Sequence, residues 1–201
     1  MGLILPVKGI FPSFGEDNWV APNATIVGDV QTGKQCTIWF NAVVRGDVNS
    51  IRIGNYSNIQ DGAVVHCTYQ KTVTTIGDYV SIAHNAIVHG CTIEDNVLIG
   101  MNAVVMDEAV VGTCSIVGAS AFVKAGMIIP PRSMVLGAPA KVVRELKDQE
   151  IAWKSMGTGE YQLLTERCLA TMQCVEPLSE IEPNRKKLNL QSPAKPKIHS
   201  M

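Results

Sequence analysis

The sequence predicts an all-β fold, a parallel β-helix of triangular coils, followed by C-terminal α-helices. Eight aliphatic residues recur at every sixth position, a spacing that fits neither the roughly 3.6-residue period of a helix nor the alternation of a simple strand. No proline lies between Pro22 and Pro130, as expected where strands form hydrogen bonds on both sides. Eight consecutive matches favour this fold over a β-sandwich with coincidental spacing. The series is Ile93, Ile99, Val105, Val111, Val117, Val123, Ile129 and Val135.

Earlier stretches carry the same spacing in shifted phases, so the repeat extends toward the N-terminus. Val65 and Ile76 are 11 residues apart, five more than one hexad, which predicts an extruded loop within Cys67–Thr75. Val88 and Ile93 are five apart, which predicts a tightened corner. The earlier inward positions are Ile38, Val44, Ile53, Ile59, Val65, Ile76, Ile82 and Val88.

Three segments are expected along the chain. Residues 1–140 form the β-helix domain, and residues 141–175 form C-terminal helices that cap the solenoid or pack along its side. Helical apolar spacing covers Lys141–Met156 and Thr158–Cys174, with Gly157 and Gly159 as the break between two helices. Residues 176–201 are expected to be an extended, mobile tail; its basic end is interpreted as solvated rather than as an anion-binding arm.

Composition excludes several classes of protein. Lys and Arg total 17 against 18 Asp and Glu, so neither nucleic acid nor a membrane surface is expected as a partner. No apolar run is long enough to span a bilayer, and the N-terminal stretch does not predict a signal peptide. The six cysteines are scattered without a CxxC pair. They predict reduced thiols and a cytoplasmic location.

Three of the four histidines lie within 24 residues: His66, His84 and His89. His66 follows Val65 and His89 follows Val88, so both occupy the first position after an inward aliphatic residue. They are therefore expected to point outward on the same face, one coil apart, because the inserted loop accounts for the excess over about 18 residues per coil. His84 belongs to the preceding strand and to a different face.

The histidine pattern predicts a metal site shared between subunits. Two imidazoles about 4.8 Å apart can bind one zinc ion at Zn–N distances of about 2.0–2.1 Å. His84 cannot easily reach the same ion within one chain, but it can do so from a neighbouring chain around a three-fold axis. We therefore expect a homotrimer with the site at its interfaces and a fourth coordination position open to water. The alternative is three unrelated surface histidines.

Polar residues near the histidines are further candidates for the site. Arg45 and Asp47 follow the inward residue of their strand and could serve either the active site or a salt bridge between subunits. Gln60 occupies the repeat position of His66 one strand earlier, where its amide could hydrogen-bond a metal-bound water or the substrate. Asn58 and Asp61 flank the same strand.

The string RGDVNSIRIGNYSNIQDGAVVH followed by AHNAIVHG resembles the γ-class carbonic anhydrase family of left-handed β-helices, over roughly residues 10–140. The resemblance implies that His66, His84 and His89 bind zinc between subunits of a trimer. It further implies that the four residues Arg45, Asp47, Gln60 and Asp61 serve the active site or the subunit interface.

The C-terminal strings AWKSMGTGEYQLLTERC and PLSEIEPNRKKL resemble one branch of this family, which includes the phenylacetic-acid-degradation protein PaaY and the carnitine-operon protein CaiE. For PaaY-type proteins this implies hydrolysis of aromatic CoA thioesters, and for CaiE-type proteins an accessory role in carnitine metabolism. Tyr161 matches a tyrosine of the branch, which implies either an approach to the site from the C-terminal helix or plain packing.

One departure from the founding carbonic anhydrases bears on the rate. Where they carry proton-shuttle glutamates, this chain has Val48 and the loop CTYQKTVTT, which lacks a carboxylate. Fast proton export is therefore not expected, whereas formation of zinc-bound hydroxide depends only on the metal. The expected activity is slow CO2 hydration, hydrolysis of CoA thioesters, or both, with CO2/bicarbonate or acyl-CoA as substrate.

Two other functions stay open. The GAPAKVVREL segment also fits a hexapeptide-repeat acyltransferase that uses acetyl-CoA and needs no metal. A non-catalytic trimeric scaffold with a vestigial metal site is the third possibility. The sequence does not identify the physiological substrate, and it does not distinguish Zn²⁺ from Fe²⁺ or Co²⁺, because affinity alone does not select a metal.

Overall fold

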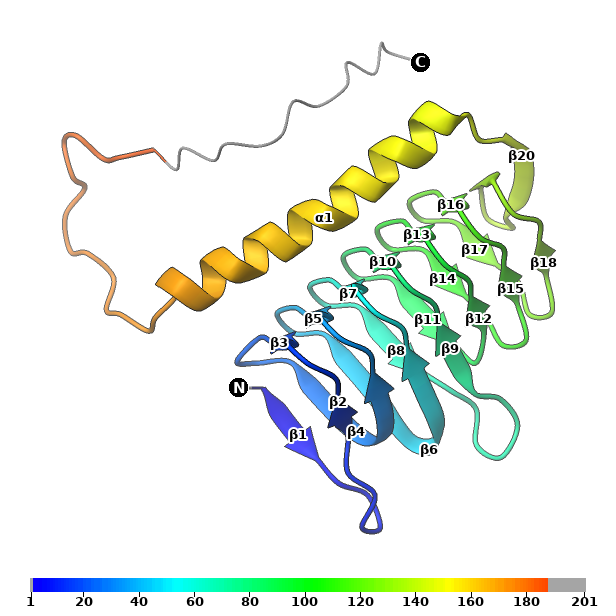
Figure 1. The fold of residues 1–201 in the computed structure, drawn as a ribbon, viewed down its shortest axis with the longest axis horizontal. Coiled ribbons are helices and arrows are strands. Elements are labelled where there is room, and N and C mark those ends of the chain that lie inside the picture. The colour runs from blue at the N-terminus through cyan, green and yellow to red at the C-terminus, as the bar shows by residue number, and fades with distance from the viewer. Residues whose placement is uncertain (1, 188–201) are drawn as a thin grey trace.

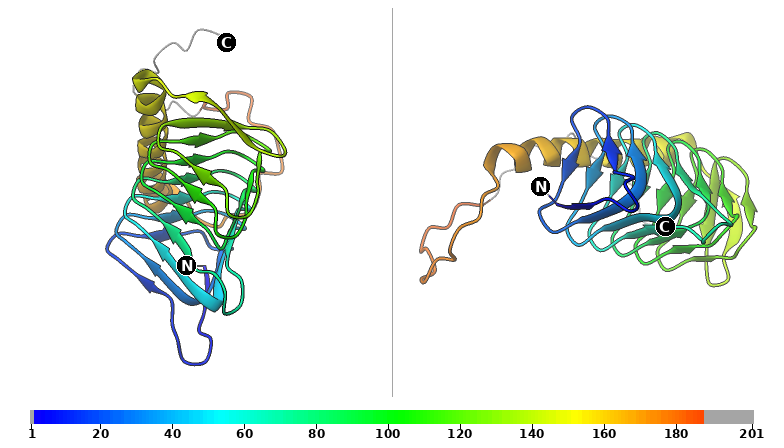
Figure 2. Two further views of the ribbon diagram at one scale, coloured as in Figure 1. Left: turned by 90° about the vertical axis from the view of Figure 1, so that its right-hand side faces the viewer. Right: turned by 90° about the horizontal axis from the view of Figure 1, so that it is seen from below.

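The computed structural model describes residues 2–187 and confirms the left-handed parallel β-helix (Figure 1). Two sheets wrap around the three faces of the solenoid, whose coils are stacked on one another (Figure 2). The 12-stranded sheet covers two faces because its long strands β4 and β6 bend from one face onto the next. Its strands are β1 (Leu3–Leu5), β2 (Ser13–Phe14), β4 (Thr25–Thr32), β6 (Val43–Ile53), β8 (Val64–His66), β9 (Thr74–Ile76), β11 (Ile87–His89), β12 (Thr92–Ile93), β14 (Val104–Val105), β15 (Val110–Val111), β17 (Phe122–Val123) and β18 (Ile128–Ile129).

The third face is an eight-stranded sheet. All its neighbouring strands are parallel except the last pair, in which β20 runs antiparallel to β19. Its strands are β3 (Trp19–Val20), β5 (Thr37–Ile38), β7 (Asn58–Ile59), β10 (Ser81–Ile82), β13 (Leu98–Ile99), β16 (Ile116–Val117), β19 (Ser133–Leu136) and β20 (Lys141–Glu145).

The hexad residues form the core of the solenoid. All eight members of the predicted series are at most 1% exposed. Aliphatic residues of successive coils stack on one another. Ile82 pairs with Ile59 of the coil before it and with Ile99 of the coil after it, and Ile99 pairs with Val117. Fully burying each such side chain stabilises the fold by about 1.5–3 kcal/mol. The narrow interior also explains why aromatic residues make up only 5% of the chain.

The predicted loop is present. Strand β8 ends at His66 and β9 begins at Thr74, and the intervening residues leave the coil without breaking the register of the strands on either side. The loop therefore adds length to one coil at a single corner.

Beyond residue 140 the prediction of two helices was wrong. Residues 141–145 form strand β20, and a single helix, α1 (Asp148–Thr171), runs without a break through Gly157 and Gly159. The valines of β20 are β-branched and suit a strand that pairs back onto β19. The helix tolerates its glycines because polar side chains on both sides of them anchor it to the coils.

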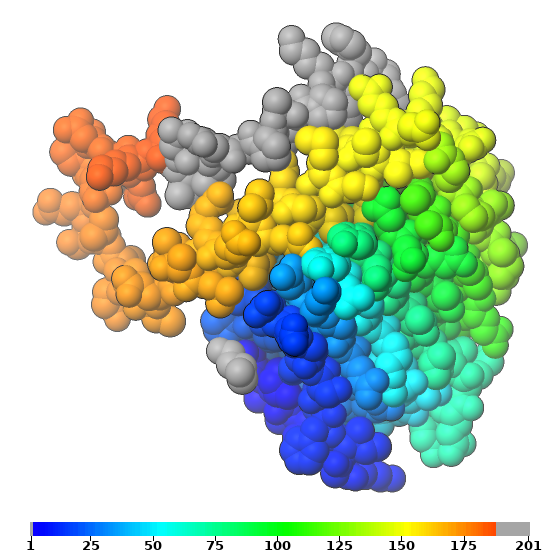
Figure 3. All heavy atoms as spheres, viewed as in Figure 1, coloured from blue at the N-terminus to red at the C-terminus, as the bar shows by residue number. Residues whose placement is uncertain are grey.

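Helix α1 lies along the eight-stranded face and spans most of the stack (Figures 1 and 3). Thr158 is 1% exposed, and its hydroxyl is 2.9 Å from that of Ser81 in β10. Lys154 is also buried, and its ammonium donates to the backbone oxygen of Tyr79 and to Oδ1 of Asn96. Burial lowers the pKa of Lys154 to about 7. These contacts fix the position of the helix on the solenoid.

Residues 172–187 contain no helix or strand, and their side chains are exposed. The prediction of an extended tail also covers residues 188–201, which lie outside the described part of the chain.

None of the described helices has the length and apolar character needed to cross a membrane. All six cysteines are free, as predicted.

The glycines of the helix and of the coils should respond oppositely to alanine. A Cβ at Gly159 meets nothing within 4 Å, whereas Gly28 has a φ of +73° and a Cβ there would lie 2.4 Å from the backbone oxygen of Gly46. We expect Gly159→Ala to raise the free energy of unfolding by about 1 kcal/mol, and Gly28→Ala to lower it by more than about 1 kcal/mol. Urea unfolding of both variants measures this; a loss of stability in Gly159→Ala would contradict it.

Candidate functional site

His66 and His89 stack on adjacent coils, as predicted. They end strands β8 and β11 and are paired in the parallel register between these strands. The imidazole Nδ1 of His66 lies 3.2 Å from Nε2 of His89. Both side chains are largely shielded, with 15% and 26% of their surfaces exposed. The strand register thus brings two ring nitrogens together on the outer face of the solenoid.

The other ring nitrogen of each histidine faces a carboxylate. His66 Nε2 is 3.1 Å from Asp47 Oδ1, and His89 Nδ1 is 3.1 Å from Asp107 Oδ2. An ionised carboxylate only accepts hydrogen bonds, so these nitrogens carry the ring protons. In the neutral imidazoles, the two nitrogens that face each other are therefore both unprotonated. Two lone pairs at this separation repel unless a cation lies between them.

Asp47 is held from two sides. Arg45 donates to its Oδ2 at 2.6 Å while His66 contacts Oδ1. Burial raises the pKa of the Asp47 carboxyl, but the hydrogen bonds from Arg45 and His66 outweigh it and lower the pKa below its usual value. The Arg45–Asp47 ion pair forms within one chain, where its carboxylate orients a histidine.

Asp107 is a site residue that the sequence reasoning missed. Its Oδ1 accepts hydrogen bonds from the hydroxyls of Thr68, at 2.6 Å, and Thr72, at 2.8 Å. Both threonines lie in the extruded loop, so the loop holds the carboxylate against His89. Burial acts to raise the pKa of Asp107, but the threonine hydrogen bonds and His89 lower it to about 2. The six-residue repeat carries a signal for this contact. Asp107 follows His89 by 18 residues, which is about one coil, so the two residues are expected to lie one above the other.

Burial lowers the pKa of His66, although the hydrogen bond to Asp47 acts in the opposite direction. The neutral imidazole is therefore the predominant form at neutral pH. A neutral imidazole with one ring proton held by a carboxylate has its second nitrogen free to bind a metal.

His84 lies apart from the other two histidines, after strand β10 of the eight-stranded sheet. Its Nδ1 is 2.8 Å from Asp61 Oδ2, and its Nε2 is 3.3 Å from the hydroxyl of Tyr161 in α1. His84 thus repeats the pattern of an imidazole with one nitrogen on a carboxylate. Within residues 2–187 of one chain, no three His, Cys, Asp or Glu side chains are grouped so that they could hold a metal ion.

Tyr161 both packs and contacts the site. Its ring meets that of Trp39 edge-on, with centroids 5.3 Å apart, while its hydroxyl reaches His84. Burial raises the pKa of Tyr161 to about 12. The phenol therefore keeps its proton at neutral pH, and its oxygen lies 3.3 Å from Nε2 of His84.

Gln60 and Asn58 belong to a buried network beneath α1. Gln60 Nε2 donates to Asn58 Oδ1 at 2.9 Å, and Asn58 Nδ2 donates to the hydroxyl of Ser81 at 2.9 Å. Gln60 also lines a pocket of about 230 Å³ together with His84 and Tyr161. The structure thus brings Gln60 close to His84, whereas Asn58 acts by fixing the amide of Gln60.

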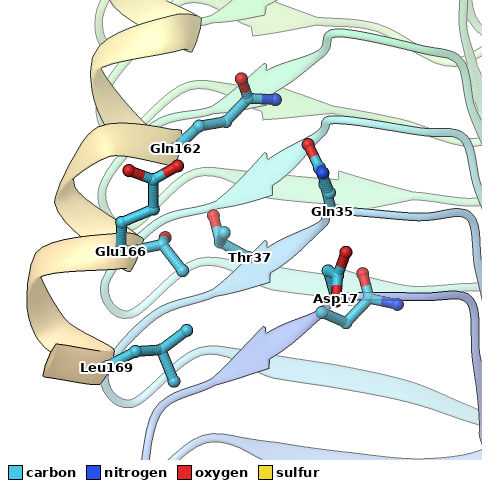
Figure 4. A pocket seen from close by; sticks show the side chains of 8 residues that line it. Asp17, Gln35, Thr37, Gln162, Glu166 and Leu169 are labelled. Atoms are coloured by element: carbon cyan, nitrogen blue, oxygen red, sulfur yellow. The ribbon is translucent and has the colours of Figure 1, made fainter.

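A second pocket, of about 430 Å³, lies between the first coils and the C-terminal half of α1 (Figure 4). Gln162, Glu166 and Leu169 reach it from the helix, and Gln35 faces them from the coils (Figure 4). None of the three clustered histidines lines this pocket, so it is separate from the candidate site.

Known proteins share this chain's repeat and much of its sequence. The model of the family "Bacterial transferase hexapeptide (six repeats)" matches residues 90–125. The carnitine operon protein CaiE of Salmonella agona is 40% identical over 190 residues, covering 94% of this chain and 96% of that protein. A probable carbonic anhydrase of Methanocaldococcus jannaschii is 57% identical over 132 residues, covering 66% of this chain and 82% of that protein.

Among solved structures, a hexapeptide transferase family protein from Anaplasma phagocytophilum superposes with a TM-score of 0.78. It is 36% identical, and the match covers 82% of this chain and 97% of that one. The likeness therefore extends over almost the whole of that protein.

The low pKa of Asp107 predicts how its contribution to stability depends on pH. The folded-state pKa of about 2 lies below the roughly 3.9 of an unfolded aspartate, so the stabilisation is present above about pH 4 and is lost as the pH falls toward 2. We expect the difference in unfolding free energy between the unmodified protein and Asp107→Asn to shrink as the pH falls from about 4 toward 2. Urea unfolding measured across this range tests this, and a difference that does not change with pH would contradict it.

Proposed function

Because this chain belongs to the γ-class carbonic anhydrase-like hexapeptide-repeat family, in the branch that includes CaiE, we propose that it is a zinc-dependent enzyme that slowly hydrates CO2, hydrolyses CoA thioesters, or does both. His66 and His89 of one subunit and His84 of its neighbour are the proposed ligands. The observation that carries the proposal is that all three imidazoles have one nitrogen on a carboxylate. The second nitrogens of His66 and His89 face each other, and that of His84 contacts only the hydroxyl of Tyr161 among the described polar groups, which a zinc ion would displace.

The residues present fit a zinc ion. Two ligand nitrogens on one tetrahedral zinc, at Zn–N distances of about 2.0–2.1 Å, lie about 3.3 Å apart, and His66 Nδ1 and His89 Nε2 are 3.2 Å apart. A cation placed there also removes the repulsion between the two lone pairs. The carboxylates of Asp47 and Asp107 supply the outer contacts that orient zinc-binding histidines.

A homotrimer supplies the third ligand. His84 lies on a different sheet from His66 and His89, so a shared site requires a neighbouring chain. Beside the two histidines runs a ladder of outward apolar side chains, one per coil and paired strand to strand. Such a column is suited to burial in a symmetric subunit interface. We call it the apolar ladder; it comprises Val43, Val64, Ile87, Val104 and Phe122.

The chain's own residues determine how fast protons can leave the site. A zinc ion bound there acts as a Lewis acid and lowers the pKa of a bound water to about 7. Asp47 and Asp107 both have lowered pKa values and do not take up protons at neutral pH. Tyr161 keeps its proton and serves as a donor. We propose that the amide of Gln60, which is held by its hydrogen bond to Asn58, orients the substrate. Slow hydration or thioester hydrolysis therefore fits better than fast anhydrase turnover.

The alternative is an acyltransferase that uses acetyl-CoA. The similarity to the hexapeptide transferase family protein from Anaplasma phagocytophilum favours this acyltransferase function. Metal content distinguishes the two proposals, because the transferase would retain activity without zinc. A metal-loaded trimer that is inactive toward both CO2 and thioesters would instead favour a scaffold.

The proposed ligands predict the metal content. We expect the purified protein to contain about one zinc per chain and His89→Ala to lose both the metal and the activity. His199→Ala, which changes the fourth histidine of the sequence, is the matched control and should keep both. Elemental analysis for Zn, Fe and Co, with assays of CO2 hydration and CoA-thioester hydrolysis, tests this. Retained zinc or activity in His89→Ala would rule out the proposed site.

The apolar ladder predicts the effect of a charge in the interface. Ile87 is 39% exposed in the single chain, so Ile87→Glu leaves the core intact but places a carboxylate where two subunits meet. We expect this variant to sediment as a folded monomer without stoichiometric zinc. Ile128→Glu, at a residue 65% exposed on another face, is the control and should stay trimeric. Analytical ultracentrifugation measures the oligomeric state of both variants. A trimeric Ile87→Glu would show that the apolar ladder is not the interface.

A further inference from the structure

A groove runs between helix α1 and the eight-stranded face. Two pockets, of about 330 and 230 Å³, share four lining residues, Ala83, Leu98, Met101 and Trp153. Because they share these walls, the two pockets form one elongated groove. Its volume lies in the range of small-molecule sites, about 300–1,000 Å³.

The lining changes character along the groove. The part farther from His84 is bounded by Ile116, Val117 and Met134 and by the small residues Gly118 and Ala119. Trp153 of α1 lines the same part, which is therefore an apolar slot between helix and sheet. Glu150 also lines it, with its carboxylate paired to Arg144. A ligand there gains by removing apolar surface from water.

The other end of the groove is polar and reaches the candidate site. Gln60, His84 and Tyr161 line it, and Tyr161 contacts His84 directly. The groove therefore leads from an apolar slot to a proposed metal ligand. An elongated ligand with a polar reacting group at one end and an apolar chain at the other matches this gradient.

We propose that the groove binds the apolar acyl chain of a thioester or ester substrate, with the carbonyl group at the His84 end. This names the substrate class of the proposed function and rests on it for the reaction, but not for the binding. The groove is held open in advance, since the contacts of Thr158 with Ser81 and of Lys154 with Asn96 fix α1 over the sheet. Binding therefore needs no rearrangement of the helix.

The length of the apolar chain should govern affinity. The probes are the thioethers S-octyl-N-acetylcysteamine and S-methyl-N-acetylcysteamine, which cannot be hydrolysed, titrated into the full-length protein by calorimetry. We expect the octyl compound to bind at least about tenfold more tightly, because each buried methylene contributes to transfer from water. Ala119→Phe, which fills the apolar part of the groove, should abolish this preference.

Ala125→Phe is the matched control, since Ala125 is also exposed but does not line the groove; it should keep the preference. So should His89→Ala, because chain binding does not need the metal. Equal affinity for the two probes in the unmodified protein, or an unchanged preference in Ala119→Phe, overturns the groove proposal even where zinc and hydration activity are present. Loss of zinc chemistry with an intact octyl preference overturns the proposed function alone.

Discussion

Hydrogen bonds between parallel strands of successive coils set the height and direction of every side chain in this solenoid. Each inner strand pairs in parallel with a strand of the coil before it and a strand of the coil after it, and neighbouring coils exchange backbone hydrogen bonds in both directions. An aliphatic residue at every sixth position faces the interior. A shift by one residue would turn that aliphatic residue outward. Burial of the inward aliphatic residues therefore determines how the strands pair. That pairing determines where the outward polar side chains lie.

The site uses this register in two ways. It places His66 and His89 at equivalent points of adjacent coils, so that two ring nitrogens approach within 3.2 Å. It then places a carboxylate behind each ring, and the extruded loop supplies two threonine hydroxyls that hold Asp107. Carboxylates that hold the ring protons leave two lone pairs facing each other. That arrangement favours a bound cation over an empty site.

The sequence was most informative where one rule, the six-residue period, determines position. It predicted the buried series, the loop and the stacking of His66 on His89. It failed beyond residue 140, where helical spacing in residues 141–145 was outweighed by pairing with β19, and where Gly157 was no barrier because Lys154 and Thr158 anchor the helix. Asp107 was not predicted because it lies 18 residues from His89 in the sequence, and only the stacking of the coils brings the two side chains together.

We propose that each metal site is assembled from two chains, and mixing two variants tests this most directly. His84→Ala keeps His66 and His89, and His66→Ala keeps His84, so each pure trimer lacks a complete site. Unfolding and refolding the two together produces mixed trimers, in each of which one interface joins the intact His84 to the intact pair. We predict that neither variant alone binds zinc and that the mixture recovers about one zinc per mixed trimer. A mixture without recovered zinc, or a pure variant with stoichiometric zinc, would contradict the shared site.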